Sequence, residues 1–221
     1  MSKIQRKLFF LALFTLIGFA SLQVPFNKLM GSNVSFTLFD FFGPIAGAFL
    51  GPLFGIISVL AVEVGNMQVK HSAWTQGSVI RLFPTLFATY YFALINKKAL
   101  SGRWILMVGP LCMLAFILHP IGRTVSYYSL FWLMPLIAFR FRSNLYMRSL
   151  GATFTAHGVG GAAWIWAFNL KASVWQGLIP VVISERILFA SGIAISYIVV
   201  KHTLSYLASK KLLPKLEHAV S

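Results

Sequence analysis

Apolar segments of membrane-spanning length follow one another through nearly the whole chain, and this pattern restricts the fold to a helical membrane protein. Hydrophobic residues make up 58% of the 221 residues, charged residues make up 10%, and the mean hydropathy is +0.79. A soluble domain of this size does not need so apolar a composition to build its core. The segments are residues 8–24, 35–68 (which divides in two), 78–95, 104–121, 125–139, 149–169 and 178–206. We therefore predict an all-α bundle of six to eight membrane segments, forming one integral membrane domain over residues 1–221.

Lysine and arginine residues are unevenly distributed among the connections between these segments. Only Lys28, Lys70 and Lys171 fall in one set of alternate connections. The other set, which includes both ends of the chain, holds Lys3, Arg6, Lys7, Lys97, Lys98, Arg103, Arg140, Arg142, Arg148, Lys201, Lys210, Lys211 and Lys215. Cytoplasmic connections of membrane proteins are enriched in Lys and Arg. We therefore predict a multi-pass protein of the cell membrane whose termini are cytoplasmic, as are the connections 96–103 and 140–148.

The first apolar segment allows a second interpretation. It has a basic start, an apolar centre and the small residues Gly18 and Ala20, as a cleavable signal peptide does. A retained membrane helix is favoured, because the charges of the later connections then alternate correctly between the two sides of the membrane.

The net charge of +15 and the single cysteine argue against several classes of function. In a soluble chain this charge would favour nucleic-acid binding, but here the basic residues lie beside membrane segments, where they orient the protein and meet anionic lipid. Cys112 is the only cysteine, so the chain cannot form an internal disulfide, a CxxC redox pair or a thiolate metal cluster. We expect the lipid bilayer as a partner, and we expect no nucleic acid, metal or cofactor.

Residues 35–68 are too long for one ordinary span and contain a turn signal near their middle. The signal is Gly51 with the proline after it, because proline lacks an N–H and glycine permits turn geometry. Each arm of the resulting hairpin has about 16 residues and a length of about 24 Å, which is short for a hydrocarbon core of about 30 Å. Gly43, Gly47, Gly51 and Gly55 recur every four residues and predict a face for close helix packing.

Six charged residues interrupt the apolar segments, although an ionised group at membrane depth costs at least a few kcal/mol. They are Asp40, Glu63, Arg81, Arg123, Glu185 and Arg186. In the predicted topology all six lie towards the outer side of the membrane, and so does His119. Interhelical ion pairs are one explanation, and a polar substrate-binding site open to the outside is the other. Because Glu185 and Arg186 are adjacent on a helix, they should point in different directions and find partners elsewhere.

One aromatic residue and one further histidine complete the candidate site. Trp164 is assigned to substrate binding, although tryptophans near an interface more often form a membrane belt. His157 lies near mid-membrane beside Gly158, Gly160 and Gly161, which allow another helix or a ligand to approach its ring. A hydrogen-bonded packing histidine is one interpretation. A proton relay or a ligand contact is the other, since imidazole donates, accepts and changes charge near neutral pH.

The sequence lacks the common catalytic and nucleotide-binding motifs GxxxxGK[ST], HExxH, GxSxG and GxGxxG. If the protein transports a substrate, it cannot couple transport to ATP hydrolysis by itself, and the energy must come from an ion gradient or from a partner. Cys112 and His119 share a helix face and would permit an intramembrane thiol enzyme, but about ten ångströms of helix separate them. We therefore expect that the protein is not an enzyme.

The segment Phe36–Gly55, with the sequence FTLFDFFGPIAGAFLGPLFG, resembles the second and third helices of the substrate-binding S components of energy-coupling-factor (ECF) vitamin transporters. The shared features are an apolar run, a Leu-Gly-Pro turn and a following glycine. The resemblance implies a small basic membrane protein with a cytoplasmic N-terminus and a substrate site near the outer face. It also implies a transmembrane coupling subunit and cytoplasmic ATPases as partners that supply energy.

These observations predict a membrane transport protein that captures a small polar or amphipathic molecule at its outer face for uptake, as an S-component-like subunit of a multi-protein importer. A self-sufficient proton- or ion-coupled secondary transporter is the main alternative, with Asp40, Glu63 or His157 as the ion site. A membrane enzyme and a purely structural role are further alternatives. The residues expected to bind the substrate are Asp40, Glu63, Arg81, His119, Arg123, His157, Trp164, Glu185 and Arg186.

Overall fold

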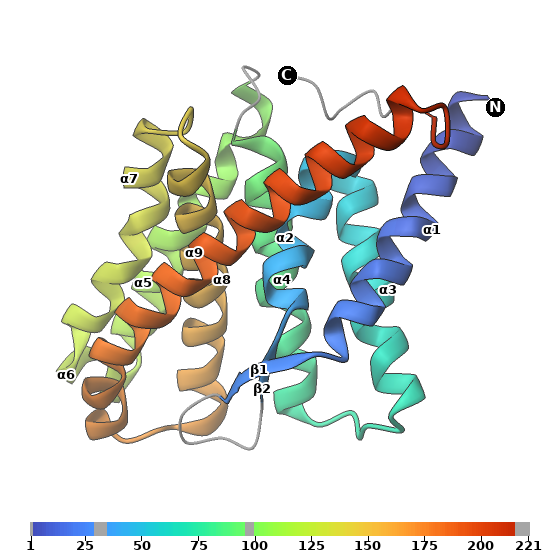
Figure 1. Cartoon of the computed structure of the whole chain (residues 1–221). Helices are drawn as coiled ribbons and strands as arrows, with labels where there is room; N and C mark the ends of the chain where they lie inside the picture. The colour runs from blue at the N-terminus through green and yellow to red at the C-terminus, as the bar shows by residue number, and fades with distance from the viewer. Residues whose placement is uncertain (1, 29–34, 96–99, 215–221) are drawn as a thin grey trace.

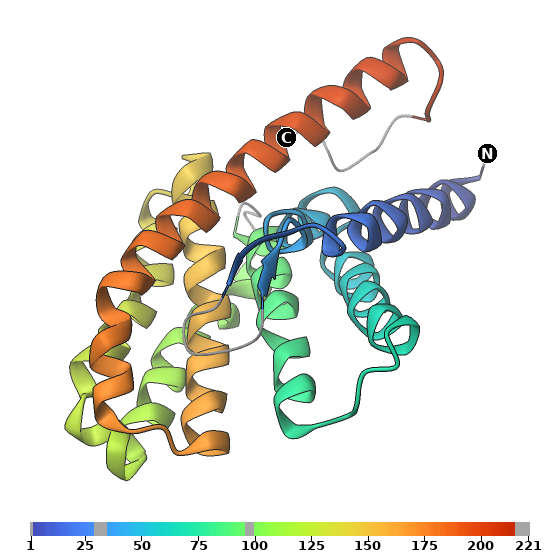
Figure 2. The same cartoon turned by 60° about the horizontal axis from the view of Figure 1, so that its bottom comes forward.

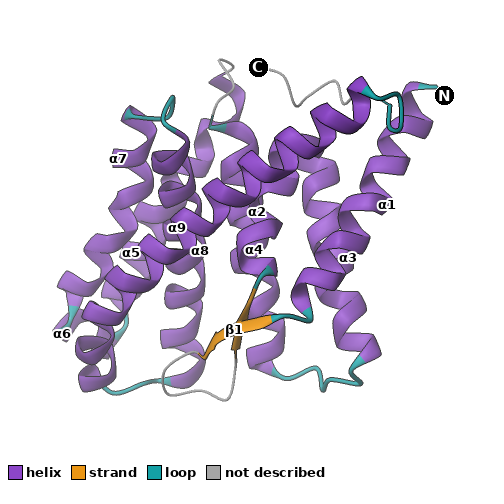
Figure 3. Ribbon diagram, in the orientation of Figure 1, coloured by secondary structure: helices purple, strands orange, loops and turns teal. Residues whose placement is uncertain are grey.

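The computed structural model describes residues 2–28, 35–95 and 100–214, which form a helical bundle with one small β-hairpin (Figures 1 and 3). The predicted all-α class is confirmed, while the hairpin was not predicted. The elements in chain order are α1 (Lys3–Leu22), β1 (Pro25–Lys28), β2 (Ser35–Thr37), α2 (Phe39–Leu50), α3 (Pro52–Val69), α4 (Gln76–Leu94), η1 (Leu100–Met107), α5 (Val108–Leu118), α6 (Pro120–Thr124), η2 (Ser126–Leu133), α7 (Met134–Arg140), α8 (Leu145–Phe168) and α9 (Ala172–Ser209).

The helices run back and forth between two ends of the bundle. α1 begins and α9 ends at one end, which is uppermost in Figure 1 and is called the upper end below. The β-hairpin and the connections α3–α4 and α8–α9 lie at the opposite, lower end. α9 has 38 residues and crosses the bundle diagonally from the lower end to the upper end (Figures 1 and 2). Its length of about 57 Å, at 1.5 Å per residue, exceeds the thickness of a hydrocarbon core.

Three of the described helices are long and apolar enough to cross a membrane. They are α1, α3 and α9. α2 and the stretch Trp104–Leu118 are apolar but shorter. Large hydrophobic side chains are exposed on all three long helices, among them Leu16, Leu53 and Ile195. Such a surface is suited to contact with lipid, as expected of a membrane protein.

The predicted break at Gly51 separates two helices. α2 ends just before Gly51 and α3 begins just after it, and Gly51 itself has a φ of 82°. Glycine adopts this positive φ readily, and Pro52 at the first position of α3 loses no hydrogen bond there. α2 begins four residues later than predicted, at Phe39, because Ser35–Thr37 pairs with Pro25–Lys28 as an antiparallel strand.

The predicted small-residue face packs α2 against α3 and α4. A Cβ atom on Gly47 would clash with the Thr89 carbonyl of α4, and one on Gly55 would lie 2.7 Å from the Gly47 Cα. A Cβ on Gly43 would lie 2.7 Å from the Thr85 side chain of α4. Close packing of helix backbones therefore accounts for Gly43, Gly47 and Gly55. The prediction was wrong for Gly51, which forms the turn and whose added Cβ would meet no described atom within 4 Å.

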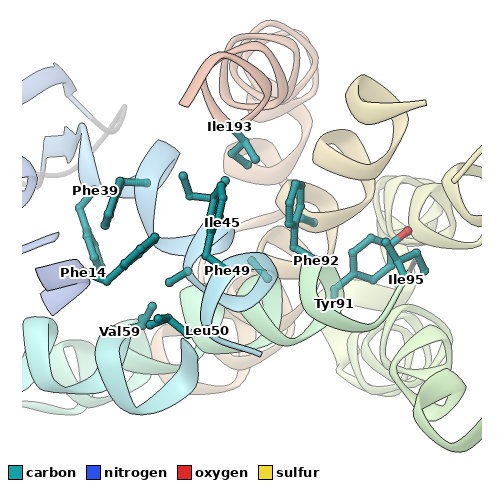
Figure 4. Packing of buried hydrophobic residues seen from close by; sticks show 14 of the residues in the cluster. Phe14, Phe39, Ile45, Phe49, Leu50, Val59, Tyr91, Phe92, Ile95 and Ile193 are labelled. Carbon is teal, nitrogen blue, oxygen red and sulfur yellow. The ribbon is translucent and has the colours of Figure 1, made fainter. Parts of the chain in front are cut away.

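Two clusters of buried side chains form the core. The larger joins α1, α2, α3 and α4, and includes Phe14 and Phe49, whose ring centroids lie 5.5 Å apart (Figure 4). The smaller surrounds Trp132 and joins α5, η2, α8 and α9. A hydrogen bond of 2.9 Å from the Tyr91 hydroxyl to the Pro135 carbonyl ties α4 to α7. The charged residues discussed next lie on helices from both parts of the bundle.

Candidate functional site

Asp40 lies in the first turn of α2, directly after the β-hairpin. Its Oδ2 accepts hydrogen bonds from the Thr37 backbone N–H at 2.8 Å and from the Thr37 hydroxyl at 3.4 Å. The helix dipole also favours a carboxylate in this turn. Arg81 of α4 and Arg186 of α9 both interact electrostatically with Asp40. The hairpin and the helix start therefore hold an acid in the field of two cations from different helices.

Glu63 of α3 and Arg81 of α4 belong to the same environment. Glu63 interacts electrostatically with Asp40 and Arg81, and it faces the Thr85 side chain. Its Oε2 is buried and has no hydrogen-bond partner in the described part of the chain. Arg81 is exposed, although it interacts with both carboxylates. Glu63 is thus a carboxylate whose hydrogen bonding is incomplete.

Glu185 and Arg186 of α9 are both buried, with 8% and 7% of their surface exposed. The prediction that they avoid each other is wrong, because Arg186 Nη2 donates to Glu185 Oε2 at 3.3 Å. Arg186 does also find a partner on another helix, as predicted. The Arg186 guanidinium lies over the Phe189 ring, 4.4 Å from its centroid. Its Nη1 also donates to the Thr153 hydroxyl at 3.0 Å. Glu185 Oε1 and Arg186 Nε still lack a partner among the described residues.

His157 of α8 is held by two side chains of η2. Trp132 Nε1 donates to His157 Nδ1 at 3.0 Å, and the Tyr128 hydroxyl lies 3.0 Å from His157 Nε2. The glycines beside His157 allow this approach, since a Cβ on Gly158 would lie 3.3 Å from the Trp132 ring and one on Gly161 only 2.6 Å. The surroundings of His157 match the interpretation of a hydrogen-bonded packing histidine.

Arg186 links several of these groups directly, and Asp40 links Arg186 to Glu63 and Arg81. The Arg186 guanidinium interacts electrostatically with Asp40, His157 and Tyr128, and Tyr128 also interacts with Glu185. We call the whole set the polar cluster, and its members are Asp40, Glu63, Arg81, Tyr128, Thr153, His157, Glu185 and Arg186. Its three acids and two arginines give a formal charge of −1. No group of three or more His, Cys, Asp or Glu side chains suited to a metal ion occurs among the described residues.

Three predicted site residues lie outside the polar cluster. His119 caps the short helix α6, where its Nδ1 accepts from the Ile121 N–H at 3.3 Å. Arg123 is exposed in the last turn of α6. Trp164 packs against Phe168 with ring centroids 4.4 Å apart. These residues were grouped with the others by their predicted depth in the membrane. Depth in the membrane does not determine which side of the bundle a residue faces.

Three residues of this environment, Tyr128, Trp132 and Thr153, were not assigned to the site from the sequence. Thr153 lies four residues before His157, a spacing that places both on one helix face, so this periodicity was a usable signal. Trp132 carried no such signal, because its role depends on how η2 packs against the glycines of α8.

Arg148 was predicted to lie in a cytoplasmic connection, but it is buried in the first turns of α8 with 7% of its surface exposed. Its guanidinium lies 5.0 Å from the centroid of the Phe92 ring and 5.3 Å from that of Tyr197. Favourable contact with these two ring faces explains why the cation turns into the bundle.

Comparisons with known proteins give one relative and no family. The chain is 28% identical to the uncharacterized protein MJ0923 of Methanocaldococcus jannaschii, in a match that covers 83% of this chain and 67% of the relative. No family model and no solved structure matches the chain. The name of the relative states no function, so a function must be inferred from the polar cluster and its surroundings.

Proposed function

We propose that the protein is a membrane transport protein that captures a small polar or amphipathic molecule at its outer face for uptake. The observation that carries the proposal is the polar cluster, in which charged residues of α2, α3, α4 and α9 converge while several of their atoms stay unpaired. A purely structural ion-pair network should be fully hydrogen-bonded, since each unpaired buried polar atom costs about 1–3 kcal/mol. The unpaired atoms of Glu63, Glu185 and Arg186 therefore support a site that a polar ligand completes.

The protein then acts as an S-component-like capture subunit of a multi-protein importer in the cell membrane. The helix–Gly51–helix hairpin that underlies the resemblance to S components supports this assignment. The sequence contains no nucleotide-binding motif. In this proposal a transmembrane coupling subunit and cytoplasmic ATPases supply the energy, and the captured small molecule and the bilayer are the other partners.

A self-sufficient secondary transporter is the second candidate, and Glu63 favours it. An incompletely bonded carboxylate beside a second acid, Asp40, is the kind of group that binds a proton or a metal ion inside a carrier. Capture remains the preferred function, because both ring nitrogens of His157, the other candidate proton site, already contact Trp132 and Tyr128.

Reconstitution distinguishes the two candidates. Purified protein in liposomes should retain its substrate from a metabolite extract, detected by mass spectrometry, but should not accumulate it under a proton or sodium gradient, because a single site without a driving subunit only equilibrates. Addition of the coupling subunit and its ATPases should give ATP-dependent uptake. Gradient-driven accumulation by the protein alone, lost in Asp40→Asn, would contradict the capture function and support the secondary carrier.

The orientation in the membrane is testable with single cysteines in a Cys112→Ser background. The α7–α8 connection lies at the upper end, with the start of α1, and the α3–α4 connection lies at the lower end (Figure 1). A cysteine at exposed Ser72 should react with an impermeant thiol reagent in intact cells, and one at exposed Ser143 only after lysis. The reverse result would invert the proposed orientation.

A further inference from the structure

Trp132 fixes the direction of each hydrogen bond in a short chain of side chains. An indole N–H only donates, so His157 Nδ1 accepts at 3.0 Å and carries no proton. The neutral imidazole therefore carries its proton on Nε2 and donates it to the Tyr128 oxygen, 3.0 Å away. The hydroxyl proton of Tyr128 is consequently available for a different acceptor.

That proton has no acceptor among the described residues. Tyr128 is buried and is hydrogen-bonded through its hydroxyl to His157 alone within the described chain. Glu185 and Arg186 are close enough to interact electrostatically with Tyr128, and each of them also has an unpaired atom. Two donors, the Tyr128 O–H and the Arg186 Nε–H, and one acceptor, Glu185 Oε1, are therefore unpaired in one region.

Charge limits which chemical group completes these contacts. Glu185 already neutralises Arg186 at 3.3 Å, and the polar cluster as a whole carries a formal charge of −1. A carboxylate-like anion would offer no donor to Glu185 Oε1 and would place a second negative charge beside it. A cation would face Arg186 and would offer no acceptor to the two donors. A neutral group with an acceptor next to an N–H satisfies all three atoms.

We propose that Tyr128, Glu185 and Arg186 recognise a neutral, carboxamide-like edge of the substrate. Its carbonyl oxygen or ring nitrogen accepts from Tyr128 and Arg186, and its adjacent N–H donates to Glu185. Trp132 and His157 are positioning residues, because they hold Tyr128 as a donor without touching the substrate. The unpaired atoms are covered by neighbouring side chains, so one of these must move to admit the group. This inference rests on the proposed capture function and names the substrate class.

Three probes of similar size but different charge test the inference: neutral benzamide, cationic benzamidine and anionic benzoate. By calorimetry on the full chain in detergent, benzamide should bind at least tenfold more tightly than either of the others. Tyr128→Phe should weaken benzamide binding about tenfold and leave benzamidine binding unchanged, because the amidinium does not accept a hydrogen bond. The matched control is Tyr127→Phe, at the exposed neighbouring residue of η2, which should change neither affinity.

The positioning role has its own readout. Nitrogen NMR, with the His157 signal assigned by its loss in His157→Gln, should show a single tautomer with the proton on Nε2. Trp132→Phe should give a mixture of tautomers and weaken benzamide binding, again without affecting benzamidine.

Several outcomes would overturn the inference. They are tighter binding of benzoate than of benzamide, equal weakening of all three probes by Tyr128→Phe, and no binding of any of them at millimolar concentration. A bridging water in place of a ligand would appear as lower thermal stability of Tyr128→Phe with unchanged discrimination. Capture of an anionic metabolite by the reconstituted protein would contradict this inference alone, whereas capture of no metabolite would contradict the proposed function itself.

Discussion

Arg186→Met should destabilise the folded protein by about 3–5 kcal/mol, because it leaves the Glu185 carboxylate buried without the cation that lies 3.3 Å away. The variant also loses the hydrogen bond to Thr153 and the stacking on Phe189. Equilibrium unfolding in mixed detergent, followed by circular dichroism, measures the change in the free energy of unfolding. Lower expression should accompany the loss of stability.

Two matched variants separate charge from packing in this experiment. Glu185→Gln combined with Arg186→Met removes both charges and should recover most of the lost stability, since no unpaired ion remains in the interior. Arg123→Met removes an exposed arginine from α6 and should change the free energy of unfolding by less than about 0.5 kcal/mol. Equal stability of the Arg186 and Arg123 variants would show that the Glu185–Arg186 pair is not essential to the interior.

Local chemistry explains which parts of the fold were predictable from the sequence. The break between α2 and α3 depends on Gly51 and the proline after it, and the structure places it there with a positive φ at Gly51. The glycine spacing correctly predicted close packing at Gly43, Gly47 and Gly55, because a residue without a Cβ lets a neighbouring helix approach its backbone. The strands Pro25–Lys28 and Ser35–Thr37 pack Phe26 and Phe36 against Phe189 of α9, a contact between segments far apart in the sequence for which there was no local signal.

The charged members of the polar cluster were predictable from the sequence, but Tyr128, Thr153 and the contacts within the cluster were not. The cost of an ion in an apolar segment identifies Asp40, Glu63 and Glu185 without any knowledge of the fold. The partner of each acid depends on how every helix is rotated about its axis. The predicted depth of a residue in the membrane does not give this rotation. The bond between adjacent Glu185 and Arg186 shows the same limit, since the helical-face rule ignores the reach of a long arginine side chain.

The α2–α4 contact should be highly sensitive to the smallest added side chain. In Gly47→Ala the new Cβ would meet the Thr89 carbonyl and lie 2.9 Å from the Ala93 side chain. A backbone carbonyl cannot turn aside as a flexible side chain does, so the two helices must separate. Since α2 also carries Asp40, we expect a loss of about 1–3 kcal/mol in the free energy of unfolding, together with weaker substrate retention.

The matched control for this prediction is Gly65→Ala. Gly65 lies within α3, and a Cβ there would meet no atom of the described chain within 4 Å. Alanine favours a helix over glycine by about 0.5–1 kcal/mol, so this variant should be at least as stable as the natural protein. Thermal unfolding of both variants in one detergent makes the comparison. Equal stability of Gly47→Ala and Gly65→Ala would mean that α2 and α4 do not touch at Gly47.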